Sequence, residues 1–494
     1  MRRRILSGVR STRRSPGGRI PAGSGIDVSG FTGMPSWAWC VILSVVLAGA
    51  DVFGADPWKR RAAVERMQPE ILAATQKRVR ALEGLRLARP IPAGLNDYKG
   101  IFHAHAEDAT HTGGTRPEML ADAIKGGVKV IFLSDHYRPP RDFIAGSWRG
   151  LKEGVLFIPG SEIRGFLIHP TNSIMTHMDK PVSEFVRVVG QGEGLIFLSH
   201  MEERPDHSME GLNGMEIYNR HYDAKRDLAT LVNLALRLTD PKEARTLAQA
   251  VRDYPDEMLA SQVQYSADYF DKWDRESVVQ RVVGVAANDC HHNQVFIVKK
   301  VDDRSVRVGT IVDKEEDMRV VTTTLRPGLA EMLQGKKPGD IVIRVDFDPY
   351  YRSFRNVSTH IFAASLDERT IRAAVREGHV YVSHDWMADP TGFWYGANWK
   401  AEASGELTAL GMMGDVVRLR PGLELGVQFA LPCHVRWMRD GKVVAESAGD
   451  RARLPVKELG VYRVEAWLEV AGEMRPWIYS NPIYIRTETK TGPL

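Results

Sequence analysis

The sequence FHAHAEDATH, residues 102–111, follows a short apolar segment and brings three histidines close together along the chain. His103 and His105 are two residues apart, and side chains with this spacing point to the same side of a strand. His111 lies six residues further on. Imidazole is a ligand that zinc, manganese and iron accept in proteins. The segment therefore predicts a metal site at the end of a strand.

Apolar segments of similar length alternate with helical stretches between residues 98 and 293. The seven strand candidates are Gly100–Phe102, Val128–Leu133, Val155–Ile158, Phe166–Ile168, Leu195–Leu198, Met215–Tyr218 and Val282–Ala287. Continuous apolar runs suit parallel strands that are buried on both faces. The carboxyl ends of parallel strands meet at one edge of a barrel, where active sites lie. The alternation predicts an α/β fold with a barrel-like sheet.

Histidine or carboxylate side chains follow six of these seven segments. The ten groups are His103, His105, His111, Asp135, His136, Glu162, His169, His200, Asp289 and His291. One tetrahedral ion needs only four ligands, so the set indicates two or three divalent ions per chain, of Zn, Mn or Fe. Such ions lie about 3.5–4 Å apart, and a hydroxide that bridges them is a nucleophile at neutral pH. Each histidine alone fits a surface or core position equally well, but the set predicts a metal-dependent hydrolase.

Five short motifs resemble those of the polymerase and histidinol phosphatase (PHP) superfamily. They are FHAHAEDATH (102–111), LSDH (133–136), PGSEI (159–163), LSH (198–200) and NDCHH (288–292). The resemblance covers about residues 98–293 and continues more weakly to about residue 395. It implies a distorted (β/α)7 barrel that hydrolyses phosphoesters at a centre of two or three metal ions.

The resemblance also implies a ligand set. The first ion would be held by His103, His105, Glu162 and Asp289. The second would share Glu162 and add His169 and His200. The third would be held by His111, His136 and His291. The family varies the distance from the glutamate to the histidine at the place of His169, and His177 is the substitute. Asp135 is expected to orient a ligand histidine.

Arginine side chains are the usual partners of a substrate phosphate because they bind its oxygens bidentately. Arg164, Arg204 and Arg220 follow predicted strands on the expected catalytic side, so they are candidates for this role, although each also fits a solvated loop. Three histidines, His207, His221 and His292, remain open as outer or acid groups. Cys290 stands between two expected ligands and is interpreted as a packing residue.

The remaining chain divides by composition. Residues 1–50 carry seven arginines and one acid and end in a short apolar run, which predicts a cleaved secretory leader; an uncleaved anchor or a cytosolic chain are the alternatives. The expected domains are a helical lead-in at 51–95, a PHP-type barrel at 96–395 with insertions at 223–276 and 295–346, and a β-sandwich at 396–494. The formal net charge of +4 comes mainly from the leader, so the rest is near neutral.

The sequence therefore predicts an exported, periplasmic or extracellular metal-dependent phosphoesterase with a small-molecule phosphoester substrate. It shows no Gly-rich phosphate loop, no nucleic-acid-binding stripe, and no run long enough for a membrane span after the leader. Two alternatives stay open. One is a metal-dependent hydrolase of an amide or lactone. The other is a metal-bearing scaffold whose sandwich binds a glycan or a partner. The aromatic residues of the sandwich, Trp437, Trp467, Trp477 and Tyr479, are interpreted as core residues, with carbohydrate or surface binding as the alternative.

Overall fold

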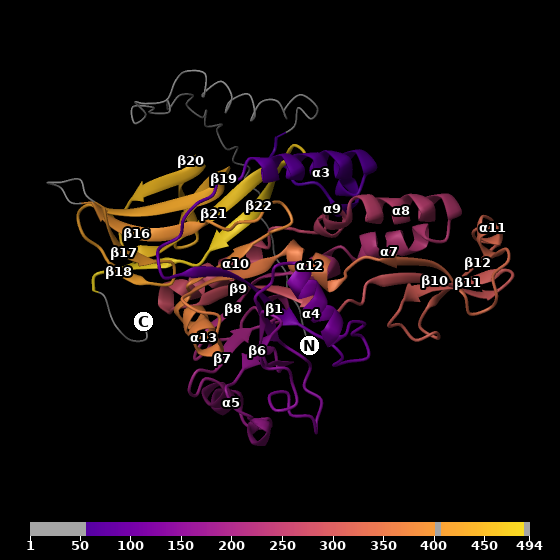
Figure 1. Ribbon diagram of the computed structural model, residues 1–494, viewed down its shortest axis with the longest axis horizontal. Coiled ribbons are helices and arrows are strands. Elements are labelled where there is room, and N and C mark those ends of the chain that lie inside the picture. The colour runs from indigo at the N-terminus through magenta and orange to yellow at the C-terminus, as the bar shows by residue number, and fades with distance from the viewer. Residues whose placement is uncertain (1–55, 401–406, 489–494) are drawn as a thin grey trace, which may run out of the picture. The chain divides into compact units, whose positions relative to one another are not determined.

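The computed structural model describes residues 56–400 and 407–488, which belong to one compact unit (Figure 1). The leader expected at residues 1–50 lies outside the described residues. Within the described part of the chain, no helix is both long and apolar enough to cross a membrane.

A mixed α/β arrangement is confirmed, with a large sheet at its centre. Its first strands are β1 (Asn96–Ala104), β2 (Val130–Leu133), β4 (Val155–Ile158), β5 (Ser161–Ile163), β6 (Phe166–His169), β7 (Leu195–Leu198), β8 (Gly214–Asn219) and β9 (Val283–Cys290). The ladder β4–β2–β1–β9–β8–β7 is parallel throughout. The short β3 (Gly150–Lys152) adds to β4 in the antiparallel sense. All seven predicted strand segments are therefore strands.

One of the seven strands runs against the others. Strand β6 pairs antiparallel with both β5 and β7. The connection from β5 to β6 is only Arg164-Gly165, and both residues have positive φ angles, of 57° and 87°. Two such residues form the tight turn of a β-hairpin, which reverses the chain. The carboxyl end of β6 therefore lies at the opposite edge of the sheet from the carboxyl ends of its neighbours.

The parallel strands are held by burial of their apolar residues. Every residue of β2, β4 and β7 is buried. Helix α4 (Arg116–Lys125) connects β1 to β2, and its first turn is closed by a capping box between Thr115 and Glu118. Helix α5 (Val182–Val189) connects β6 to β7, with a 3-10 turn, η2 (Met175–His177), before it. A second 3-10 turn, η3 (Met201–Glu203), follows β7.

Two long excursions leave the sheet. Helices α6 (Arg220–Arg226), α7 (Leu228–Arg237), α8 (Pro241–Asp253), α9 (Pro255–Ala260) and α10 (Ala267–Val279) lie between β8 and β9. After β9 comes a four-stranded antiparallel sheet of β10 (Val295–Asp302), β11 (Ser305–Thr310), β12 (Arg319–Thr322) and β13 (Ile341–Asp346), with α11 (Leu329–Leu333) before β13. Apolar residues of α8, α9 and this sheet form one core cluster, so the helical segment and the four-stranded sheet pack against each other.

The chain then returns to β1. Helix α12 (Tyr350–Asn356) precedes β14 (Ser358–Ala363), which pairs antiparallel with the first half of β1. Helix α13 (Glu368–Glu377) leads to β15 (Val380–Ser383), which pairs with β14. The last strands are β16 (Trp394–Lys400), β17 (Leu407–Met412), β18 (Val416–Arg418), β19 (Leu423–Arg439), β20 (Lys442–Pro455), β21 (Gly460–Val470), β22 (Glu473–Ser480) and β23 (Ile483–Arg486).

This strand-rich region is consistent with a sandwich, and it joins the rest of the sheet where β22 pairs with β15. Its aromatic side chains Trp437, Trp467, Trp477 and Tyr479 are all buried, which confirms their interpretation as core residues. Helix α2 (Ala63–Arg66) and helix α3 (Pro69–Gly84) come before β1, and α3 packs against α9 and β21. A buried ion pair of 2.6 Å between Arg66 and Glu473 fixes α2 to the start of β22.

Candidate metal centre

Imidazole rings from four separate segments gather at the carboxyl ends of β1, β2, β7 and β9. The ring of His105 stacks on that of His291 with 4.1 Å between centroids, and it lies 4.5 Å from the ring of His136. The ring of His103 lies 5.1 Å from His105 and 5.2 Å from His200. Contacts of this kind between ionisable rings indicate a shared site.

Among the described residues, His200–Glu202–Glu203 and three other groups of donors could hold a metal ion, and those three consist only of expected ligands. These three groups are His103–Glu162–His200, His103–His105–Asp289 and His105–His136–His291. Within each group the donor atoms lie within 4.8 Å of one another. Because the groups share members, they form one continuous cluster rather than three isolated sites. All seven side chains were expected as ligands from the sequence.

The carboxylate of Glu162 lies at the centre of the cluster. Its Oε2 atom is 3.4 Å from Nε2 of both His103 and His136, and its Oε1 atom is 3.2 Å from Nε2 of His200. Asp289 has a similar place, because its Oδ1 atom lies 3.4 Å from Nε2 of His103 and its Oδ2 atom 3.4 Å from Nε2 of His200. Carboxylates placed between imidazoles in this way can bridge neighbouring ions.

The orientation of the imidazoles fits metal binding. Nδ1 of His103 donates to Glu216 at 2.6 Å, and Nδ1 of His105 donates to Asp108 at 2.9 Å. Protonation at Nδ1 leaves Nε2 with a free lone pair. Among the described residues, the buried Nε2 atoms of His103, His105 and His291 have no hydrogen-bond partner. Buried polar atoms are normally paired. The three lone pairs are therefore placed for a cation.

Two carboxylates that orient the candidate ligands were not predicted from the sequence. Glu216, on β8, also accepts from the backbone N–H of His200 at 2.9 Å. Asp108 also accepts from both the backbone N–H and Nδ1 of His136, at 2.8 and 2.7 Å. The sequence did contain a signal for Glu216, because it is the only carboxylate within the apolar strand segment at 215–218.

The expected role of Asp135 differs in the structure. Its carboxylate contacts the guanidinium of Arg116 and lies 3.4 Å from Arg141, and it accepts a long hydrogen bond from the N–H of Ala106. It forms no hydrogen bond with a histidine in the described residues. Asp108 makes the contact that was expected of Asp135, because the loop after β1 brings Asp108 between His105 and His136.

His169, an expected ligand, is in none of the donor groups that could hold a metal ion among the described residues, although both nitrogens of its buried ring have no hydrogen-bond partner. It pairs with Leu195 at the beginning of β7, because β6 is antiparallel to β7. Its ring lies 5.1 Å from Phe132 and 6.5 Å from Phe102, inside the apolar core. Burial, with a contribution from the charge of Arg372, lowers the pKa of His169 to about 3. Its substitute, His177, lies in η2 beside Thr176 and is also outside the cluster.

Of the four remaining histidines singled out from the sequence, two lie beside the cluster and two do not. The exposed ring of His111 lies 4.9 Å from the rings of both His136 and His291, at the margin of the cluster. Nδ1 of His221, at the start of α6, lies 3.8 Å from Oδ2 of Asp289. In contrast, His207 bonds the carbonyl of Ser208 and His292 bonds Asp346, so neither reaches a ligand side chain.

The three candidate arginines are committed to partners within the protein. Arg164 donates to the carbonyl of Lys180 at 2.7 Å and stacks on Phe185. Arg204 donates to the carbonyls of Ser199 and His200, at 3.4 Å each. Arg220 is buried and donates to Gln294 at 2.8 Å. None of the three forms an ion pair with a side chain of the cluster in the described residues.

The backbone at the site is strained in three places. His103, His200 and Asp289 have φ angles of 59°, 45° and 45°, in the left-handed region. A residue other than glycine costs of order 1–3 kcal/mol in such a conformation, and these residues gather at functional sites. The three strained residues are all candidate ligands, as expected if their backbone conformation orients their side chains for metal binding.

The electrostatics of the cluster favour a cation. Burial raises the pKa values of Glu162 and Asp289, but the surrounding histidines, His103 foremost, lower them far more, so both are carboxylates. Burial also lowers the pKa of His200, yet hydrogen bonds with Glu162 and Glu202 raise it to about 10. Carboxylates thus concentrate positive charge on the imidazoles. A divalent ion would supply that charge directly.

Comparisons with known proteins give structural likenesses only, to three solved chains. No protein-family model matches the chain, and no curated protein matches it. This chain is similar to a two-domain structure. That crystal structure is of a protein from Bacteroides vulgatus containing a predicted PHP-like metal-dependent phosphoesterase; the identity is 12%, the TM-score is 0.30, and 81% of this chain and 99% of that chain are covered.

Proposed function

We propose that the chain is a metal-dependent phosphoesterase with two or three divalent ions (Zn, Mn or Fe) and a small-molecule phosphoester substrate. One observation carries the proposal. The Nε2 atoms of His103, His105 and His291 are buried without partners beside Glu162 and Asp289, and carboxylates outside the cluster hold the opposite nitrogens of His103 and His105. Such a donor set suits borderline divalent metals.

The proposed fold around this site is a distorted (β/α)7 barrel at residues 96–395, with insertions at 223–276 and 295–346. Support comes from the six-stranded parallel ladder β4–β2–β1–β9–β8–β7 and from β6, which pairs with β7 at the end of this ladder. An isolated parallel β-bridge between His136 and Glu162 also links the segment after β2 to strand β5. We further propose a lead-in at 51–95, a β-sandwich at 396–494, and export through the arginine-rich leader.

Residues in and around the cluster would have distinct tasks in the proposed reaction. Divalent ions, when bound, supply a hydroxide nucleophile and neutralise the phosphoryl oxygens. Glu162 and Asp289 would hold neighbouring ion positions together, since each lies within 3.4 Å of three imidazoles. Glu216 and Asp108 keep the proton of the ligand imidazoles on Nδ1. His221, which lies 3.8 Å from Asp289 and is partly exposed, would be the residue that gives a proton to a leaving group.

One observation favours the alternative of amide or lactone hydrolysis. Each of the three candidate arginines already donates to a protein oxygen, so none of them offers a substrate phosphate a wholly free guanidinium. In the proposed phosphoesterase, the metal ions alone would neutralise the phosphate. The same centre could therefore polarise an uncharged carbonyl. The buried aromatic side chains of the C-terminal strands, in contrast, give no support to glycan stacking.

Hydrolysis assays distinguish the two activities. Full-length protein loaded with Zn or Mn would be tested against an aryl phosphate, a nucleotide, a sugar phosphate, an amide and a lactone. We expect release of phosphate, and we expect the double variant His103→Ala/His105→Ala to lose it by at least 1000-fold. His177→Ala, a histidine outside the cluster, is the matched control and keeps full activity. Turnover of the amide or lactone alone supports the alternative, and unchanged turnover in the double variant refutes the catalytic assignment.

A further inference from the structure

His200 is a member of the candidate cluster whose ring is oriented by neither Glu216 nor Asp108. Its Nε2 atom lies 3.2 Å from Oε1 of Glu162 and 3.4 Å from Oδ2 of Asp289. Its backbone N–H donates to Glu216. Within the described part of the chain, however, neither Glu216 nor Asp108 forms a hydrogen bond with its ring. The direction of the ring therefore depends on other contacts.

Glu202 holds the other nitrogen of this ring. Nδ1 of His200 donates to Oε1 of Glu202 at 3.2 Å. Glu202 lies in η3, two residues after His200, and its side chain is only 10% exposed. A carboxylate beside Nδ1 keeps the ring proton there and leaves the lone pair of Nε2 for an ion. Glu202 therefore has the same relation to His200 as Glu216 has to His103.

The carboxylate of Glu202 is itself fixed by a tyrosine from the helical excursion between β8 and β9. The hydroxyl of Tyr269, on α10, donates to Oε2 of Glu202, so each carboxylate oxygen has its own partner. The Tyr269 side chain is fully buried, and its ring stacks on that of Tyr222 with 5.5 Å between centroids. Lys272, from the same helix, donates to two backbone carbonyls of the segment after η3, at 2.9 and 2.8 Å. Helix α10 thus holds both Glu202 and the segment that follows it.

A second role for Glu202 is that of a ligand, because His200, Glu202 and Glu203 form a further group of donors. Two of these donors are already engaged. Glu203 is exposed and pairs with Lys225 at 2.7 Å. A neutral imidazole has one lone pair, so His200 cannot bind an ion through Nδ1 while Nε2 serves the ion position beside Glu162. The contacts therefore favour orientation of His200 over a separate ion.

We propose that Glu202 is a positioning residue of the metal centre and that Tyr269 keeps it in place. Glu202 directs Nε2 of His200 to the ion position beside Glu162. The inference rests on the proposed function, because Glu202 has this task only if His200 is a ligand. It gives the excursion α6–α10 a part in the site, although none of the donor groups among the described residues includes a residue of these helices.

Cobalt titrations of the metal-free full-length chain test this task, because the visible absorption of bound Co²⁺ reports the geometry of its ligands. Competition with a colourless chelator gives the affinity. We expect Glu202→Ala to weaken the binding of one ion about 10–100-fold and to change its spectrum. We expect Tyr269→Phe to weaken the same ion at least about threefold, since Glu202 then loses one of its two partners. A side chain with only a structural role would lower the urea midpoint of the metal-free chain and leave the spectrum unchanged.

Two neighbouring side chains provide matched controls. Glu203→Ala removes an exposed carboxylate from the same turn, and Tyr222→Phe removes a hydroxyl that donates to Asp268 instead of Glu202. Both controls should bind Co²⁺ within twofold of the unchanged chain. If Glu203→Ala loses as much affinity as Glu202→Ala, the two glutamates are ligands of a separate ion and the proposal is wrong.

His200→Ala distinguishes failure of this inference from failure of the proposed function. Loss of the same ion in His200→Ala, and its weakening in Glu202→Ala and Tyr269→Phe, support both. If His200→Ala loses an ion while Glu202→Ala stays within twofold, the positioning role is wrong and the metal centre stands. If Glu202→Ala alone weakens the ion, the part assigned to Tyr269 is wrong. If the unchanged chain binds fewer than one Co²⁺, the proposed function fails and the positioning role fails with it.

Discussion

Replacement of Glu216 by glutamine tests how the candidate centre is organised. Glu216 is fully buried on β8 and accepts three hydrogen bonds. Its Oε1 atom receives Nδ1 of His103 at 2.6 Å. Its Oε2 atom receives the N–H of His200 and the amide of Asn219, each at 2.9 Å. Glutamine keeps the shape of the side chain but offers only one acceptor oxygen.

Either orientation of the new amide harms the site. If its oxygen serves His200 and Asn219, its NH2 group faces Nδ1 of His103, and the ring proton moves to Nε2, the nitrogen that faces the cluster. If its oxygen serves His103, the NH2 group opposes two donors. Loss of such an outer partner lowers metal affinity by about 10–100-fold, or about 1.4–2.7 kcal/mol. We expect a loss within that range for Glu216→Gln.

A competition titration with a chromophoric chelator, on full-length protein, measures this affinity directly. Asp223→Asn is the matched control, because Asp223 is equally buried but contacts none of the cluster, and burial raises its pKa to about 7. We expect the control to bind metal within twofold of the unchanged protein. The reasoning is refuted if Glu216→Gln also stays within twofold, or if Asp223→Asn loses as much affinity.

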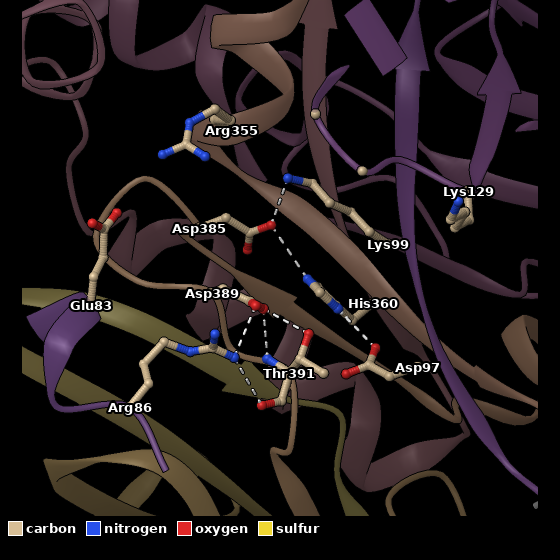
Figure 2. Close-up of a pocket in the computed structure, with 12 residues that line it drawn as sticks. Glu83, Arg86, Asp97, Lys99, Lys129, Arg355, His360, Asp385, Asp389 and Thr391 are labelled. Atoms are coloured by element: carbon tan, nitrogen blue, oxygen red, sulfur yellow. Dashed lines mark hydrogen bonds and ion pairs between the residues drawn. The ribbon is translucent and has the colours of Figure 1, made fainter. Parts of the chain in front are cut away.

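Three further predictions concern other parts of the molecule. His169→Phe should leave the number of metal ions per folded chain unchanged, as measured by mass spectrometry, because His169 lies at the opposite edge of the sheet from the cluster. Loss of an ion in this variant would show that His169 is a ligand. Asp108→Asn lowers the content by about one ion per chain, since Asp108 orients both His105 and His136, and an unchanged content would contradict this. The neighbouring carboxylates, which Figure 2 shows on either side of the ring, raise the pKa of His360 to about 10 in the folded chain, against an ordinary value of about 6.5. The charged ring therefore contributes fully to the free energy of unfolding below about pH 6.5, and this contribution declines as the pH rises toward 10. Urea unfolding should therefore show a steeper alkaline loss of stability, by up to about 1.4 kcal/mol per pH unit, than in His360→Asn; parallel curves would exclude the charged ring.

The sequence predicts the strands and most of the cluster for a simple reason. Runs such as Val130–Leu133 and Leu195–Leu198 are buried on both faces, so they are apolar throughout. Side chains directly after parallel strands meet at one edge. That rule brings His136, His200 and Asp289 together from segments more than 60 residues apart.

The same rule fails for His169, because a short apolar run has the same composition in either direction. The direction of β6 depends on the Arg164-Gly165 turn, whose glycine was the available signal. Glu216 and Asp108 were missed for a different reason. Their partners are set by side-chain contacts, such as the 2.6 Å contact of Glu216 with His103, 113 residues earlier in the chain. Strand periodicity contains no information on such pairs.

Metal content of the purified full-length chain tests the central claim most directly. Inductively coupled plasma mass spectrometry, with protein concentration from amino-acid analysis, would give the number of ions per chain. We expect two or three divalent transition-metal ions in the unchanged protein and fewer than one in His103→Ala/His105→Ala. Fewer than one ion per unchanged chain after loading with Zn, Mn or Fe would contradict the metal centre and the hydrolase proposed from it.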